Sequence, residues 1–261
     1  MRSVIVLAVV STVAACGYDD STAAPVRGPL VAIEMSAPDS VVIAGASTQL
    51  TVVGRDAQQQ EIRGLAGLTF TSSDPFSVIV SQDGLVTALF NPFRPLTSTL
   101  TATIISDGVT LSATKRIAIG NPAPPTFDHA ALMLPEAVRP EPVSQIGQGI
   151  IYVTVDGARV QYKVLWSLLS GPAVSAHIHG PDTEDGVAPV LVDLPLGSQS
   201  ATHGQVTGSF SAADIRPQGG KPPISLDSLI ALMGTFSTAY ADIHTTLFRD
   251  GEMRGLLSRV R

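Results

Sequence analysis

The chain has 261 residues, 44% of them hydrophobic and only 15% charged, with 23 glycines, 19 prolines and a formal net charge of −6. The negative charge and the lack of a basic stripe argue against a nucleic-acid partner. The many glycines and prolines favour short strands and turns over long charged helices, so we predict an all-β protein with two domains.

The first 15 residues have the form of a secretory leader. Arg2 precedes an apolar run over residues 4–13, which is too short for a membrane-spanning helix of about 20 residues. The run ends in Val-Ala-Ala-Cys, with the only cysteine of the chain at Cys16, and this ending resembles the lipobox of bacterial lipoproteins. The resemblance implies that residues 1–15 are a cleaved signal peptide and that Cys16 is lipidated. The alternative is an ordinary leader with an incidental small-residue cleavage site.

Lipid at Cys16 would hold the protein at a membrane without a spanning helix. Gly17 rather than aspartate follows the cysteine, which in proteobacterial lipoproteins favours the outer membrane. We therefore expect an extracytoplasmic protein at the outer membrane or cell surface rather than the inner membrane. Residues 16–29 are small, polar and proline-containing, and we predict that they form a flexible tether.

Residues 30–119 carry the alternation of half-buried strands. The apolar positions are Leu50 and Val52 within residues 47–53, and later Leu100, Ala102 and Ile104. Asp107-Gly108 lies between two apolar runs and is the two-residue signal for a type I′ hairpin.

The order of these pieces resembles the group 2 bacterial immunoglobulin-like domain. Its elements are an opening strand ending at residues 40–45, Thr-Ser-Ser-Asp-Pro at 71–75, Asp-Gly-Leu-Val-Thr at 83–87, and the final hairpin. Phe70 with Thr71 stands where that family usually has a tryptophan. The resemblance implies a β-sandwich that serves as a surface spacer or, less commonly, as an adhesion module.

Residues 120–126 contain three prolines, which remove backbone donors and interrupt a strand, so we place a linker there. We expect residues 127–261 to form a second domain that folds independently. In it, the turn Asp156-Gly157 joins two alternating runs into a hairpin with one buried face. One short helix is predicted over residues 226–233, capped by Ser225 and ended by Gly234.

The second half resembles the chordin-type (CHRD) domain. The motifs that carry the resemblance are Ala-His-Ile-His-Gly-Pro at 176–181, Tyr-Ala-Asp-Ile-His-Thr at 240–245 and Gly-Glu-Met-Arg-Gly at 251–255. Asp242 stands where the family usually has asparagine. The resemblance implies an extracytoplasmic β-sandwich of immunoglobulin-like shape without an established catalytic activity. The predicted fold is thus two β-sandwich, immunoglobulin-like domains in tandem.

The histidines of these motifs form the candidate site. Residues two apart on a strand share a face, so His177 and His179 point together while Val174, Ala176 and Ile178 point the other way. By the same rule His244 shares a face with Tyr240 and Asp242. If the strands are neighbours, three imidazoles converge, which suits zinc or copper. Asp242 or Glu252 would then supply a fourth ligand or an outer hydrogen-bond acceptor.

A polar cluster without an ion is the favoured alternative. In it the three histidines, Tyr240, Asp242, Glu252 and Arg254 would form a hydrogen-bonded group that closes one end of the sandwich. We predict no catalytic residue, because nucleophile-elbow, zinc-protease and phosphate-loop motifs are all missing from the sequence. The five histidines of the chain are too few for the two-metal site of copper/zinc superoxide dismutases. His129 and His203 are expected at the surface.

The sequence therefore favours a lipid-anchored binding or structural protein, with a CHRD domain displayed on an immunoglobulin-like spacer. A metal-binding or redox domain is the alternative. The membrane is the one partner that the sequence indicates, and it identifies no protein or glycan partner.

Overall fold

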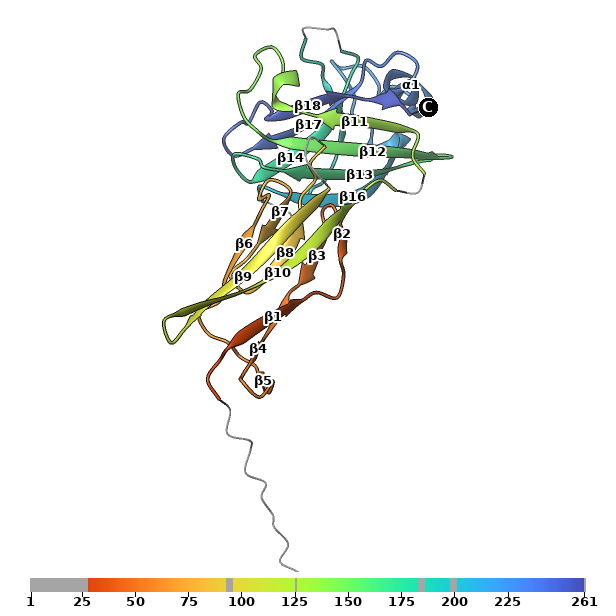
Figure 1. Cartoon of the computed structure of the whole chain (residues 1–261). Helices are drawn as coiled ribbons and strands as arrows, with labels where there is room; N and C mark the ends of the chain where they lie inside the picture. The colour runs from red at the N-terminus through yellow and green to blue at the C-terminus, as the bar shows by residue number, and fades with distance from the viewer. Residues whose placement is uncertain (1–27, 93–95, 125, 183–185, 198–200, 261) are drawn as a thin grey trace, which may run out of the picture.

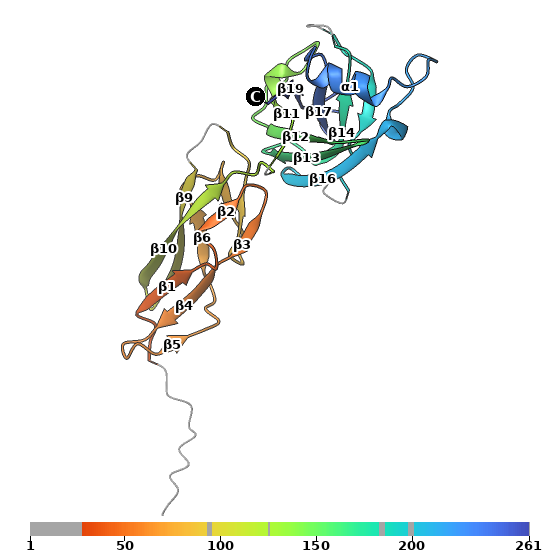
Figure 2. The ribbon, with the colours of Figure 1, turned by 90° about the vertical axis from the view of Figure 1, so that its right-hand side faces the viewer.

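The chain folds into two β-sandwich domains that lie end to end, which confirms the predicted fold class (Figure 1, Figure 2). The computed structural model describes residues 28–92, 96–124, 126–182, 186–197 and 201–260. The predicted signal peptide, Cys16 and most of the predicted tether lie outside the described residues. None of the helices in the described ranges has the length and apolar character needed to cross a bilayer.

The N-terminal domain is built from three small sheets, with strand orders β1-β4-β5, β2-β10-β9-β6 and β3-β8-β7. The strands are β1 (Ala32–Ser36), β2 (Val41–Ile43), β3 (Ser47–Gln49), β4 (Thr51–Arg55), β5 (Glu61–Ile62), β6 (Thr69–Ser72), β7 (Val78–Val80), β8 (Leu85–Ala88), β9 (Thr97–Ser106) and β10 (Val109–Gly120). Pairing is antiparallel except between β2 and β10, which run parallel.

The long hairpin β9–β10 confirms the turn predicted at Asp107-Gly108. Both residues have positive φ, 51° and 77°, as a type I′ turn requires. The alternation in β9 is also confirmed, because Leu100, Ala102 and Ile104 are buried on one face.

The single strand predicted over residues 47–53 is in fact two strands. β3 pairs with β8 and β4 pairs with β1, so the chain changes sheets at Leu50. The Leu50 N–H donates to the carbonyl of Gly84 at 2.9 Å, which anchors the crossing point. One continuous alternation thus serves two sheets, and the hydrophobic period alone does not mark the break.

The C-terminal domain packs a five-stranded sheet, order β16-β13-β12-β11-β19, against a four-stranded sheet, order β15-β14-β17-β18. The elements are β11 (His129–Met133), a 3₁₀ helix (Pro135–Ala137), β12 (Gln148–Asp156), β13 (Arg159–Ser167), β14 (Ala173–His179), β15 (Val190–Asp193), β16 (Gly204–Ser211), a second 3₁₀ helix (Ala212–Asp214), α1 (Leu226–Met233), β17 (Tyr240–Thr245), β18 (Met253–Leu256) and β19 (Ser258–Arg259).

Helix α1 has the predicted bounds and cap. The Ser225 side chain accepts a hydrogen bond from the N–H of Ser228, which satisfies one free donor of the first turn, and Gly234 is the C-cap residue. Leu229 and Met233 are fully buried and join the core between the sheets. The helical spacing of apolar residues was therefore a reliable guide here.

Strand β13 is buried on both faces at one end, although the sequence predicted a single buried face. Val160, Tyr162, Val164 and Trp166 point into the core as expected. Leu165 points the opposite way and is nevertheless fully buried, because it packs with Tyr152 against the apolar residues of the N-terminal domain.

The contact around Leu165 belongs to a closely packed junction that joins the two domains. The carbonyl oxygen of Phe90 accepts hydrogen bonds from Gln148 Nε2 at 2.8 Å and from Ser167 Oγ at 2.6 Å, and all three residues are buried. Lys163 Nζ donates to the carbonyl of Pro122 at 2.8 Å. Side chains and the linker backbone thus join the two domains, in addition to the covalent link.

Candidate functional site

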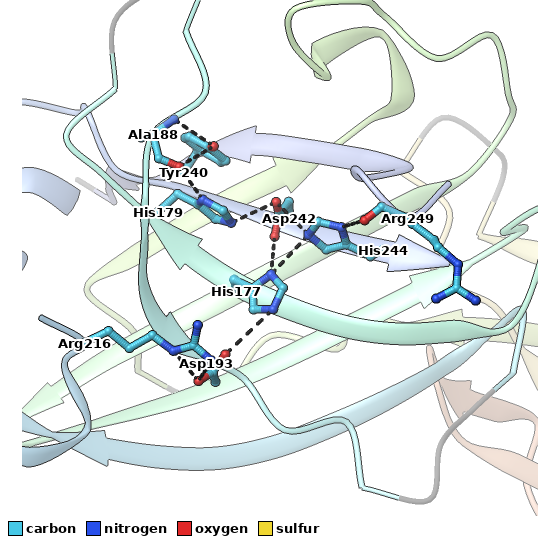
Figure 3. Close-up of polar contacts among 9 residues, drawn as sticks. All are labelled: His177, His179, Ala188, Asp193, Arg216, Tyr240, Asp242, His244 and Arg249. Carbon is cyan, nitrogen blue, oxygen red and sulfur yellow. Dashed lines mark hydrogen bonds and ion pairs between the residues drawn. The ribbon is translucent and has the colours of Figure 1, made fainter. Parts of the chain in front are cut away.

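Strands β14 and β17 lie side by side and bring the predicted histidines together (Figure 3). Their antiparallel register places His177 opposite Asp242, His179 opposite Tyr240, and Ser175 opposite His244. Alternate residues of both strands, including Ile178 and Ile243, enter the core, so the histidines lie on the outer face of the four-stranded sheet. The cluster therefore does not close one end of the sandwich.

Asp242 lies at the centre of the three imidazoles. Its Oδ2 is 3.0 Å from His179 Nε2 and 3.1 Å from His244 Nε2, and its Oδ1 is 3.4 Å from His177 Nδ1. His177 Nδ1 is 3.1 Å from His244 Nε2. One donor atom from each of the four residues lies within 4.8 Å of all the others. We call these four residues the His-Asp cluster.

Each imidazole has an acceptor on the side away from Asp242. His179 Nδ1 donates to the carbonyl of Ala188 at 2.7 Å, and His244 Nδ1 donates to the carbonyl of Arg249 at 2.7 Å. His177 Nε2 is 3.7 Å from Asp193 Oδ1. A carbonyl oxygen only accepts, so Nδ1 of His179 and of His244 carries hydrogen, and in the neutral rings both Nε2 lone pairs face the cluster.

Tyr240 and Arg254 form a stack behind His179. The rings of His179 and Tyr240 are parallel within 8° with centroids 4.7 Å apart, and the Arg254 guanidinium lies 3.6 Å from the Tyr240 centroid on the ring face. Arg254 also donates to the carbonyl of Gly186 at 3.0 Å and pairs with Asp182. These contacts restrict the orientation of the His179 ring, so Tyr240 and Arg254 act as its supports.

The charges in the cluster shift the pKa values of its members. Burial by itself raises the pKa of Asp242, but the close contacts with His177, His179 and His244 outweigh burial and hold this pKa far below its ordinary value. Burial lowers the pKa of His244, yet the Asp242 carboxylate more than compensates and the net shift is upward. Burial, reinforced by the charge of Asp242, raises the pKa of Tyr240 to about 12. The carboxylate is therefore ionised and the phenol neutral at ordinary pH.

A cavity of about 360 Å³ opens onto the cluster. His179, Asp242 and His244 contribute to its wall, together with Tyr240 and Arg254. A small solute or ion can therefore approach three members of the cluster from this side.

Glu252 lies apart from the histidines, so the sequence-based placement of this residue in the cluster is wrong. Its carboxylate is completely buried and accepts from the Ser170 N–H, the Ser170 hydroxyl and the Thr245 hydroxyl, each at 2.7 Å. Glu252 thus braces the turn between β17 and β18 rather than serving as a ligand. His129, expected at the surface, is buried beside Gly234, whereas His203 is partly exposed.

Sequence reasoning did not identify the outer partners of the rings. Two of them are backbone carbonyls, of Ala188 and Arg249, and any residue type supplies a carbonyl. Asp193 follows the apolar part of β15, and its contact with Arg216 Nε at 2.7 Å depends on the tertiary fold. The pairing of β14 with β15 brings Asp193 opposite His177. The order of strands in the sheet has to be known before this contact can be predicted.

Comparison with protein families gives a match in the second half of the chain. Residues 129–257 match the family described as the CHRD domain. No curated protein sequence gives a significant match. The chain shows weak structural similarity to the Escherichia coli adhesin FdeC (13% identity, TM-score 0.24, 88% of this chain and 64% of that one) and to the Yersinia pseudotuberculosis adhesin InvE (16%, 0.24, 90% and 60%). Human protocadherin-24 EC1-2 is similarly distant (12%, 0.23, 70% and 97%). The chain therefore spans less than two thirds of either adhesin structure, and scores this low support no functional transfer.

Proposed function

Residues 129–257 form a CHRD domain, and from this premise we propose that the chain is a lipid-anchored extracytoplasmic protein with a binding or structural role. In this proposal the immunoglobulin-like domain is a rigid spacer that presents the CHRD domain away from the membrane. The leader and the lone Cys16 support the anchor. The buried junction between the domains is the observation that supports the rigid spacer.

The junction resists bending because its polar atoms are buried and paired. Swinging the domains apart would break the hydrogen bonds that Gln148 and Ser167 donate to the Phe90 carbonyl, each worth about 0.5–1.5 kcal/mol net. It would also expose Leu165, whose burial is worth about 2 kcal/mol. Strand β1, near the start of the first domain, lies far from β14 and β17, the strands that carry the His-Asp cluster (Figure 1, Figure 2). The spacer would thus hold the cluster at a set distance from its own residue-28 end, where the predicted tether joins it.

Truncating the junction leucine tests the rigid spacer. In the Leu165→Ala chain we expect the free energy of unfolding to fall by about 2–4 kcal/mol, because a fully buried leucine is lost and a cavity remains. Because the domains share part of their core, the wild type should unfold in one thermal transition, and Leu165→Ala should unfold in two. Scanning calorimetry measures both, and small-angle X-ray scattering should show a broader distribution of interdomain distances.

Leu256→Ala is the matched control for this variant. Leu256 lies in the same domain but is 53% exposed, so its truncation should change stability by less than about 0.5 kcal/mol. If Leu165→Ala behaves like Leu256→Ala in calorimetry and scattering, the junction does not couple the domains and the rigid spacer is wrong.

Removing the lipidation residue tests the anchor. The wild-type chain expressed in a bacterium should require detergent for extraction from membranes, whereas Cys16→Ser should be recovered without detergent. The reason is that Cys16→Ser removes the attachment point of the acyl chains that anchor the protein in this proposal. Ser21→Ala, in the predicted tether, serves as the control and should fractionate with the wild type. Retention of Cys16→Ser in salt-washed membranes would contradict the anchor.

A further inference from the structure

We infer that His177, His179, His244 and Asp242 form a binding site for one divalent transition-metal ion, Zn²⁺ or Cu²⁺. The site depends neither on the lipid anchor nor on the spacer, because all four residues belong to β14 and β17. It would give the CHRD domain a ligand of defined chemical class.

The spacing of the four donor atoms fits a metal ion. Ligands about 2.0–2.1 Å from a tetrahedral zinc ion lie roughly 3.3–3.4 Å from one another. Four contacts between donor atoms of the cluster range from 3.0 to 3.4 Å, with Asp242 contributing both carboxylate oxygens. The widest separation within the set is below 4.8 Å, so only small side-chain movements would complete the coordination sphere.

The rings are already oriented as ligands. The carbonyls of Ala188 and Arg249 hold the Nδ1 hydrogens of His179 and His244, which directs both Nε2 lone pairs inward. Asp193 lies beside the outward nitrogen of His177 and is itself held by Arg216. An acceptor outside each metal-binding imidazole is the usual arrangement of a metal site, because it fixes the tautomer and the ring plane.

Two buried atoms of the cluster have ion-pair contacts but make no hydrogen bond. His179 Nε2 lies 3.0 Å from Asp242 Oδ2, and Asp242 Oδ1 lies 3.4 Å from His177 Nδ1. Within the described part of the chain neither atom makes a hydrogen bond, although both residues are only 5% exposed. A cation at the centre would be bound by both, and it would compensate the negative charge of the buried carboxylate.

The donor set also selects the class of metal. Three imidazole nitrogens and one carboxylate oxygen suit zinc and copper, whereas calcium and magnesium require sets of oxygen ligands. The 360 Å³ cavity reaches His179, Asp242 and His244, so an ion can enter from this side without unfolding of the sheet.

The test uses the full chain, purified without a polyhistidine tag and treated with EDTA. Titration calorimetry with ZnCl₂ or CuCl₂ should give one ion per chain, and elemental analysis after dialysis should retain it. The electron paramagnetic resonance spectrum of the Cu²⁺-loaded wild type should show coupling to three nitrogens. A spectrum with fewer nitrogens, or no retained ion, would overturn the site.

Variants locate the ion. The His177→Ala and Asp242→Asn variants should bind the ion at least 100-fold more weakly than the wild type. Both should still fold, because His177 lies at the exposed side of the cluster and asparagine preserves the volume of Asp242. Circular dichroism checks the folding. His203→Ala removes a histidine outside the cluster and should bind as tightly as the wild type. Equal affinity in all three variants, or an equal loss in His203→Ala, would show that the ion binds elsewhere. The wild-type copper spectrum decides the outcome even if a cluster variant unfolds.

Discussion

Replacing Gly255 with alanine is expected to destabilise the CHRD domain by about 3 kcal/mol and to lower its melting temperature by about 10 °C. The reason is a backbone contact between the two sheets. A Cβ atom at Gly255 would lie 2.1 Å from the carbonyl oxygen of Leu132 and 2.7 Å from its carbon. Leu134 and Arg254 exchange backbone hydrogen bonds of 2.9 and 3.2 Å beside this point, so the strands cannot separate without losing them. Thermal unfolding followed by circular dichroism measures the effect.

Gly147→Ala is the control for this substitution. Gly147 is buried in the same domain, but its Cβ would meet neighbours only at 3.4 Å, an ordinary van der Waals distance. The unfolding free energy of Gly147→Ala should therefore stay within about 1 kcal/mol of the wild-type value. Similar melting temperatures for the two variants would show that the close approach of β18 to β11 is not a constraint on the fold.

Replacing Glu252 with alanine is expected to cost about 3–5 kcal/mol of unfolding free energy. Three donors, two on Ser170 and one on Thr245, would lose their acceptor in a fully buried place. The same turn carries Arg249, whose carbonyl orients His244, so metal affinity should fall together with stability. Chemical denaturation measures the first effect, and titration with ZnCl₂ measures the second.

Two further variants, Glu252→Gln and Glu141→Ala, test whether the loss of stability comes from the missing hydrogen-bond acceptor. The amide of glutamine keeps an acceptor for the Ser170 N–H, and the two hydroxyls can rotate to accept from it, so the cost should drop to about 1–2 kcal/mol. Glu141 is exposed in the same domain, and its loss should be nearly neutral. A Glu252→Ala protein as stable as Glu141→Ala would refute the bracing role.

Local signals in the sequence were sufficient for the hairpins, the helix and the shared face of His177 and His179. Each depends on residues close together in the chain, such as Asp107-Gly108 or the Ser225 cap. Strand parity also correctly predicted that His244 and Asp242 share a face, because the two residues lie on the same strand. These features could be predicted because one strand or one turn decides them.

Features that depend on tertiary contacts were missed. Leu165 appears in the sequence as an exception on the polar face of β13, and only the adjacent domain explains it. Glu252 belongs to the same short motif as Arg254, yet the turn after β17 directs it to Ser170, 82 residues away in the chain. A register shift in β14 between Ala173 and Ser175 likewise leaves Val174 46% exposed, where simple alternation had placed it with Ala176 and Ile178. Bulges and cross-domain contacts have no reliable signature in a single sequence.

The parallel pairing of β2 with β10 has a mechanical consequence. The chain enters β2 from the side of residue 28 and leaves β10 toward the CHRD domain, with Val41, Val42 and Ile43 in register with Ala118, Ile119 and Gly120. A force that pulls the CHRD domain away from residue 28 therefore acts along these two strands in opposite directions. Their hydrogen bonds are loaded in shear and must break together rather than one after another. A protein tethered at one end and held by a partner at the other would thus bear tension through hydrogen bonds that share the load.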